Sequence, residues 1–73
     1  MQTQANRRTQ RAVLGLALYE YPNRLSPQTL ERQIGEGVEH ATAVLVAVGL
    51  LSREGDGVAP TLAAVHFDWL EAS

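Results

Sequence analysis

The 73-residue chain contains no cysteine, its basic residues are all arginines, and only 5% of its residues are aromatic. Without cysteine it has neither a disulfide framework nor a metal site of the cysteine type. No segment resembles a cleaved signal peptide or a membrane span, so we expect a cytoplasmic protein that uses no membrane. With six arginines and a formal net charge of −2, the chain lacks the basic character of a protein that coats nucleic acid. Any binding of nucleic acid would have to involve a small basic part of the surface.

A chain of this length forms one domain with a small core, which a partner often completes. Residues 1–6 are polar and carry no pattern, so we expect a flexible tail there and a single domain over 7–71. From about residue 7 to 21, good helix formers carry apolar residues at helical spacing, which predicts a first helix. Pro22 follows and cannot continue the hydrogen-bond ladder, so it ends that helix.

Capping signals bound the next two helices. Ser26 is a suitable N-cap, Pro27 suits the first helical position, and Gly35 can adopt the left-handed conformation after a helix. A second helix is therefore predicted over about 27–34. Residues 38–48 are nearly all apolar or small, and they predict a third helix that ends at Gly49.

The segment GLLSREGDGVAPT, residues 49–61, places turn-forming residues between two short apolar pairs. Its Asp-Gly pair supplies the positive φ angles of a tight turn, which predicts a β-hairpin around 54–57 with Gly49 and Gly57 at positive φ. Thr61 then caps a fourth helix. The expected fold is mainly α with a small β-hairpin, in the order helix, helix, helix, hairpin, helix.

Two segments, LSPQTLERQIG and VLVAVGLLSREGDGVAPT, resemble parts of the winged helix-turn-helix domain family. The first is similar to the family's second helix, and the second to the end of its recognition helix with the wing. The resemblance covers about residues 10–71 and identifies no particular member. It implies a three-helix core, a wing and a C-terminal helix, and it implies a small transcriptional regulator that binds double-stranded DNA as a homodimer.

In that family the early residues of the third helix reach base edges, while basic residues hold phosphates. Here those early positions are rich in acids, which can accept a hydrogen bond from cytosine but release no counterions. The arginines near residues 7–11 are equally typical of a solvated helix end. The wing tip, EGDG, is acidic and should repel a phosphate backbone. The candidate DNA-binding residues that the resemblance implies are Arg7, Arg8, Arg11, Gln28, Glu39, His40 and Arg53.

Apolar residues cover more of the third and fourth helices than one small core can take. A helical wheel places Val38, Ala41, Leu45 and Val48 of the third helix inward, which leaves its other apolar residues outside. Such residues either pack in a thin core or meet another chain. In many winged-helix regulators the terminal helices form a twofold dimer. The candidate protein-interface residues are Leu16, Ala43, Val46, Ala47, Phe67, Trp69 and Leu70.

No arrangement of residues indicates catalysis. The two histidines, His40 and His66, have no metal-ligand partner at a recognisable spacing, and neither Ser26 nor Ser52 lies in a nucleophile-elbow context. We therefore expect no enzyme, no metal and no cofactor. Two hypotheses of function remain: a DNA-binding regulator that acts as a homodimer, and a winged-helix module for protein interaction or dimerisation that does not bind DNA.

Overall fold

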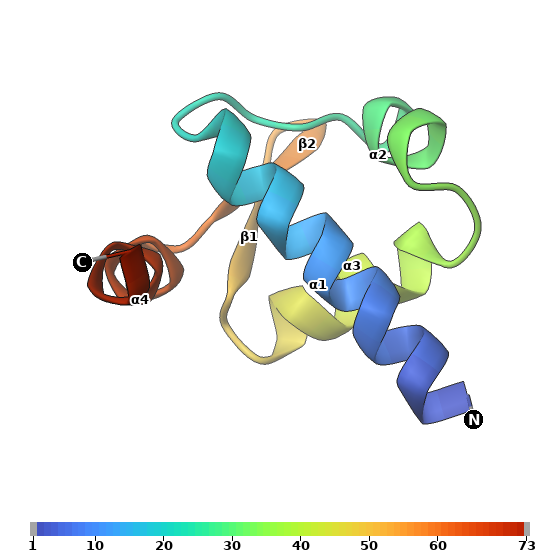
Figure 1. Ribbon diagram of the computed structural model, residues 1–73. Coiled ribbons are helices and arrows are strands. Elements are labelled where there is room, and N and C mark those ends of the chain that lie inside the picture. Colours follow the sequence, from blue (N-terminus) through green and yellow to red (C-terminus); the bar gives the residue numbers. More distant parts are fainter. Residues whose placement is uncertain (1, 73) are drawn as a thin grey trace.

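The computed structural model describes residues 2–72, with side chains described from Arg7 to Ala72. Within residues 2–72 the chain forms four helices and one two-stranded antiparallel hairpin (Figure 1). The predicted mainly helical fold with a small hairpin is confirmed. None of the helices in the described part is both long enough and apolar enough to cross a lipid bilayer. The elements are α1 (Gln2–Glu20), α2 (Pro27–Gln33), α3 (Val38–Ala47), β1 (Leu51–Glu54), β2 (Gly57–Pro60) and α4 (Leu62–Ala72).

Helix α1 begins earlier than the sequence pattern predicts. It starts at Gln2 rather than near Arg7, so most of the segment expected to be a tail has a helical backbone. The residues QTQAN contain neither glycine nor proline, so nothing in them interrupts the hydrogen-bond ladder. Met1 and Ser73, at the two ends of the chain, lie outside the described residues.

The predicted caps of α2 are confirmed. Ser26 is extended, with φ −81° and ψ 155°, and its Oγ accepts a hydrogen bond from the Thr29 amide at 3.1 Å. Gly35 follows the helix with φ 106°, a conformation that favours glycine. The observed end at Gln33 lies one residue before the predicted one.

The hairpin is present, but its turn differs from the predicted one. The strands pair antiparallel, with Leu51 opposite Pro60 and Glu54 opposite Gly57. Positive φ occurs at Gly55, at 59°, and not at Gly57, so the prediction for Gly57 is wrong. The two central residues are Gly-Asp, and such a turn needs positive φ at the first of them rather than at the residue after.

Gly57 is required for a different reason. The backbones of Leu25 and Val58 exchange two hydrogen bonds of 2.9 Å, which brings the segment before α2 beside β2. A Cβ atom at Gly57 would lie 2.5 Å from the Leu25 carbonyl oxygen. Only glycine permits this close approach of two backbones.

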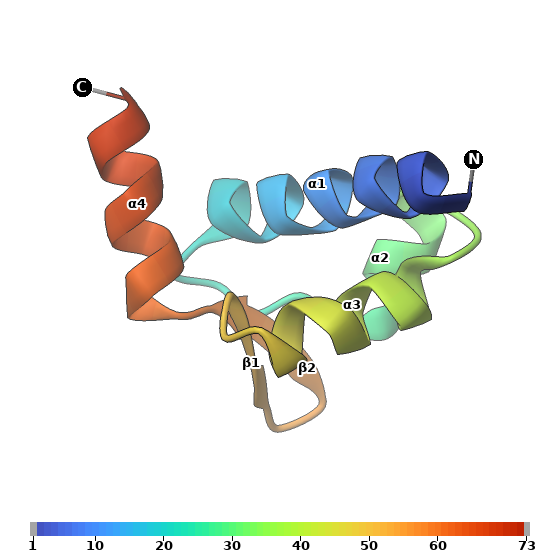
Figure 2. The same ribbon diagram turned by 90° about the horizontal axis from the view of Figure 1, so that it is seen from below.

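The core lies where α3 packs between α1 and the hairpin (Figure 2). Thr42 of α3 is 7% exposed, whereas Val48, which we expected inward, is 63% exposed. The buried residues of α3 include Thr42, so the inward face of the helix is turned toward Thr42 and away from Val48. The buried residues of the core are Val13, Ala17, Leu25, Leu30, Val38, Ala41, Leu45, Leu51 and Val58.

Helix α4 begins at the predicted cap, Thr61. Its Oγ1 accepts a hydrogen bond from the Ala64 amide at 3.2 Å and donates one to the Gly49 carbonyl oxygen at 2.8 Å. This second bond ties the start of α4 to the glycine that follows α3. Gly49 has φ 88°, as predicted. From this attachment α4 runs past the carboxyl end of α1, to one side of α2 and α3 (Figure 2).

Candidate functional site

The segments that carry the predicted phosphate-binding arginines lie apart. Arg7, Arg8 and Arg11 are exposed near the amino end of α1, and Arg53 is exposed on β1. In both views the amino end of α1 and the hairpin turn lie on different sides of the molecule (Figures 1 and 2). The fold therefore does not gather these four residues into one basic surface.

The outward side of α3 carries little positive charge. Glu39, His40, Ala43 and Ala47 are all exposed, and none of them is a lysine or arginine. Val46, which we expected on the outside, is half-buried and packs against the core. Gln28, the remaining predicted DNA contact, is exposed on α2.

The hairpin turn is held by Arg24, which no pattern in the sequence indicated. Arg24 donates a hydrogen bond from Nη1 to the Glu54 carbonyl oxygen at 3.3 Å. Ser52 Oγ donates to the Glu54 side chain, Oε2, at 3.1 Å. Arg24 and Glu54 are 30 positions apart, so no local pattern could have paired them.

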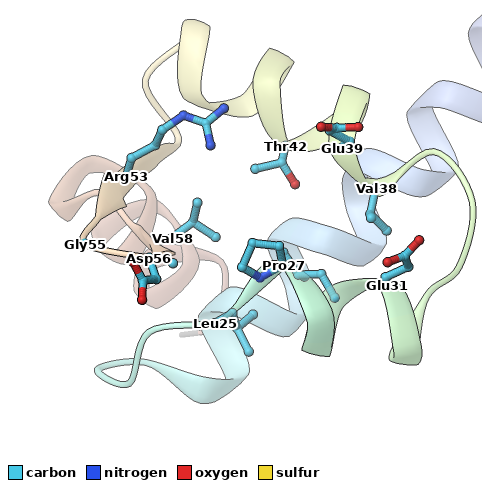
Figure 3. A pocket seen from close by; sticks show the side chains of 12 residues that line it. Leu25, Pro27, Glu31, Val38, Glu39, Thr42, Arg53, Gly55, Asp56 and Val58 are labelled. Atoms are coloured by element: carbon cyan, nitrogen blue, oxygen red, sulfur yellow. The ribbon is translucent and has the colours of Figure 1, made fainter.

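A cleft of about 330 Å³ opens between α2, the first half of α3 and the hairpin (Figure 3). Buried apolar side chains line its floor: Leu25, Leu30, Val38 and Val58. Thr42 lies among them. Charged side chains surround the opening, and they are Glu31, Glu39, Arg53 and Asp56.

Helix α4 leaves most of its apolar side chains exposed. Of its eleven residues, all within the described part of the chain, Ala64 alone is buried. The exposed fraction is 63% for Phe67, 62% for Trp69 and 52% for Leu70. Trp69 lies beside His66, with ring centroids 5.6 Å apart.

A groove of about 430 Å³ runs between α1 and α4. Leu14 and Leu18 of α1 form one wall, and Phe67 of α4 forms part of the other. Leu16, predicted as an interface residue, is half-buried and packs against the core. The groove is also lined by Leu50, Ala64, Asp68 and Glu71.

Within residues 2–72 no three histidine, aspartate or glutamate side chains come close enough to hold a metal ion together. Comparisons with protein-family models, with curated proteins and with solved structures found no match. Two surfaces of the described residues are therefore the candidates for a functional site: the cleft and the exposed side of α4.

Proposed function

We propose that the chain is a winged-helix module for protein association that forms a homodimer through α4. The observation that carries the proposal is the exposure of Phe67, Trp69 and Leu70 on a helix that buries only Ala64. Burying one large apolar side chain stabilises a complex by about 1.5–3 kcal/mol. Exposed apolar side chains that lie together on a small protein mark interaction surfaces. Phe67 and Leu70 are three positions apart and share one face of α4, and Trp69 lies on the flank next to Leu70.

A second copy is the partner because the chain carries two complementary apolar features. Trp69 and Leu70 are exposed on α4, and the groove between α1 and α4 is walled by Leu14 and Leu18. In a twofold dimer each copy would insert these exposed residues into the groove of the other. One contact of this kind is then made twice, which doubles the apolar area removed from water.

The winged-helix part of the proposal is supported by the backbone bonds between Leu25 and Val58. They add a short strand segment, between α1 and α2, beside the hairpin. The resulting order is helix, strand, helix, helix, strand, strand. The three helices, the hairpin and α4 follow one another in the order that the resemblance of the sequence implies.

Size-exclusion chromatography with light scattering, over a range of micromolar concentrations, tests the proposed dimer. We expect the wild-type protein to be a dimer and Trp69→Glu to be a monomer with nearly the same melting temperature, because Trp69 is outside the core. Tyr19→Glu is the matched control, since Tyr19 is an aromatic residue of α1 with 83% of its surface exposed. A wild-type protein that stays monomeric at every concentration would contradict the proposal.

DNA binding is the second candidate function, and the same helix order favours it. Gln28 and Arg53 would then face the duplex with α3, and a dimer would present each arginine twice. Fluorescence anisotropy with a mixed-sequence duplex at about 50 mM and 200 mM salt separates the candidates, because phosphate contacts weaken steeply with salt. Binding that falls steeply between these salts, and that Arg53→Ala weakens on any sequence, would favour the second candidate. The first predicts no such binding.

A further inference from the structure

We propose that the cleft between α2, α3 and the hairpin binds a short peptide segment of a partner protein, in which an aliphatic residue lies next to a lysine or arginine. The proposal goes beyond the association through α4 and uses none of the α4 residues. It follows from three properties of the cleft in Figure 3: its floor, the hydroxyl group of Thr42 and the charges at its opening.

The floor is suited to an aliphatic side chain. Leu25, Leu30, Val38 and Val58 are each at most 8% exposed, yet all four line the open volume. The volume of about 330 Å³ is at the lower end of the range for ligand pockets, roughly 300–1,000 Å³. An aliphatic side chain placed there would exchange water contacts for contacts with four rigid apolar groups.

Thr42 supplies a hydrogen-bonding group inside the cleft. The residue is 7% exposed, and Figure 3 shows its side-chain oxygen directed into the open space. A hydroxyl group can both donate and accept a hydrogen bond, so it could pair with a backbone carbonyl or amide of a bound peptide.

The charges at the opening of the cleft favour a basic residue next to the aliphatic residue of the peptide. Figure 3 shows Glu31 of α2 and Glu39 of α3 at one end of the cleft and Arg53 of β1 at the other. A lysine or arginine of the peptide would lie between the two glutamates. Arg53 would donate to a peptide carbonyl, since guanidinium groups have donors and no acceptor.

The same charges disfavour a nucleic acid in this cleft. Asp56 on the hairpin turn adds a third carboxylate to those of Glu31 and Glu39, against the single guanidinium of Arg53. Three carboxylates oppose the approach of phosphates, because like charges repel and no counterions are released. A cationic peptide is attracted by the arrangement that repels DNA.

The test is an NMR titration of the ¹⁵N-labelled protein with two matched peptides, acetyl-Ala-Lys-Leu-Ala-amide and acetyl-Ala-Glu-Leu-Ala-amide. We expect the lysine peptide to shift the amide signals of Leu25, Thr42 and Val58. We also expect it to bind about two- to fivefold more tightly than the glutamate peptide, the range that exposed ion pairs provide. Equal affinities for the two peptides, or shifts confined to other parts of the domain, would overturn the proposal.

Two variants sharpen the test. Glu31→Gln combined with Glu39→Gln changes only exposed side chains, and it should remove the preference for lysine while leaving the fold intact. Thr42→Val should weaken both peptides alike, because it removes the hydroxyl but neither glutamate. The proposal would be contradicted if the double glutamine variant still preferred the lysine peptide. It would also be contradicted if that variant gained salt-sensitive binding to a DNA duplex and kept its full affinity for the lysine peptide.

Trp69→Glu separates this proposal from the homodimer. The substitution lies on α4, which contributes no residue to the cleft. The lysine peptide should therefore bind this variant as it binds the wild type, whether or not the protein dimerises. Loss of peptide binding in this variant would overturn the separation of the two sites.

Discussion

Helices α3 and α4 are both rich in apolar residues but have very different surroundings. Both consist mainly of small and apolar residues, VEHATAVLVA in α3 and LAAVHFDWLEA in α4. Helix α3 buries Val38, Ala41, Thr42 and Leu45, whereas α4 buries only Ala64. The difference comes from position, because α3 is covered by α1 on one side and the hairpin on the other, while α4 follows the hairpin and lies to one side of α2 and α3 (Figure 2).

This contrast shows that apolar content alone does not place a residue in the core. The core is complete without the larger side chains of α4, since each buried position of α1, α3 and the hairpin already has partners. Exposed groups as large as Phe67 and Trp69 contribute little to the stability of the isolated domain. We expect these side chains to stabilise the proposed homodimer instead.

The largest predicted effect compares one leucine from each helix. Leu45→Ala should lower the free energy of unfolding by about 2–5 kcal/mol, because Leu45 is buried in the core and leaves a cavity. Leu70→Ala should change it by about 0.5 kcal/mol or less, since Leu70 is 52% exposed. Urea unfolding in the monomeric Trp69→Glu background measures both. If both variants lost a similar free energy of unfolding, Leu70 would be as well packed as Leu45, and the contrast between α3 and α4 would be wrong.

The second prediction compares a glycine that has no room for a Cβ atom with a glycine that has room for one. Gly57→Ala should cost about 1–3 kcal/mol, because the new Cβ would meet the Leu25 carbonyl at 2.5 Å. Gly15→Ala should stabilise by about 0.5–1 kcal/mol, since α1 is helical there and the new Cβ would have no atom within 4 Å among those described. Thermal unfolding shows whether each variant is more or less stable than the wild-type protein. An unchanged melting curve for Gly57→Ala would show that the backbones of 25 and 57 separate easily.

The smallest predicted effect concerns the attachment of α4. Thr61→Ala removes the N-cap and the bond to the Gly49 carbonyl, and it should cost about 1 kcal/mol. Hydrogen exchange should accelerate for the amides of the first turn of α4 and stay unchanged in α3. Ser26→Ala, which removes the cap of α2, is the matched control and should leave the exchange of α4 unaltered. Equal acceleration in α3 would mean that the two helices open together.

The features that sequence reasoning predicted correctly are local ones. The caps Ser26 and Thr61, and the left-handed glycines 35 and 49, follow from the conformational preferences of single residues near helix ends. The hairpin and the order of elements follow from spacing and turn residues. None of these depends on which distant segment lies nearby.

The features that it missed depend on contacts between distant segments. The pairing of Leu25 with Val58 explains Gly57, and Arg24 reaches the Glu54 carbonyl across the turn. The cleft gathers Glu31, Thr42 and Arg53 from three elements, and no spacing in the sequence joins them. For the candidate site, the sequence indicated exposed apolar residues on α4, but it gave no sign of the cleft.

The two backbone bonds between Leu25 and Val58 also have a consequence for folding. They close a loop that contains α2, α3 and β1, so these elements are enclosed between the paired positions. Closing such a loop is entropically costly and is compensated only once the enclosed helices have packed. The amides of residues 25 and 58 should therefore exchange with solvent only when the whole domain opens, and they would report its global unfolding.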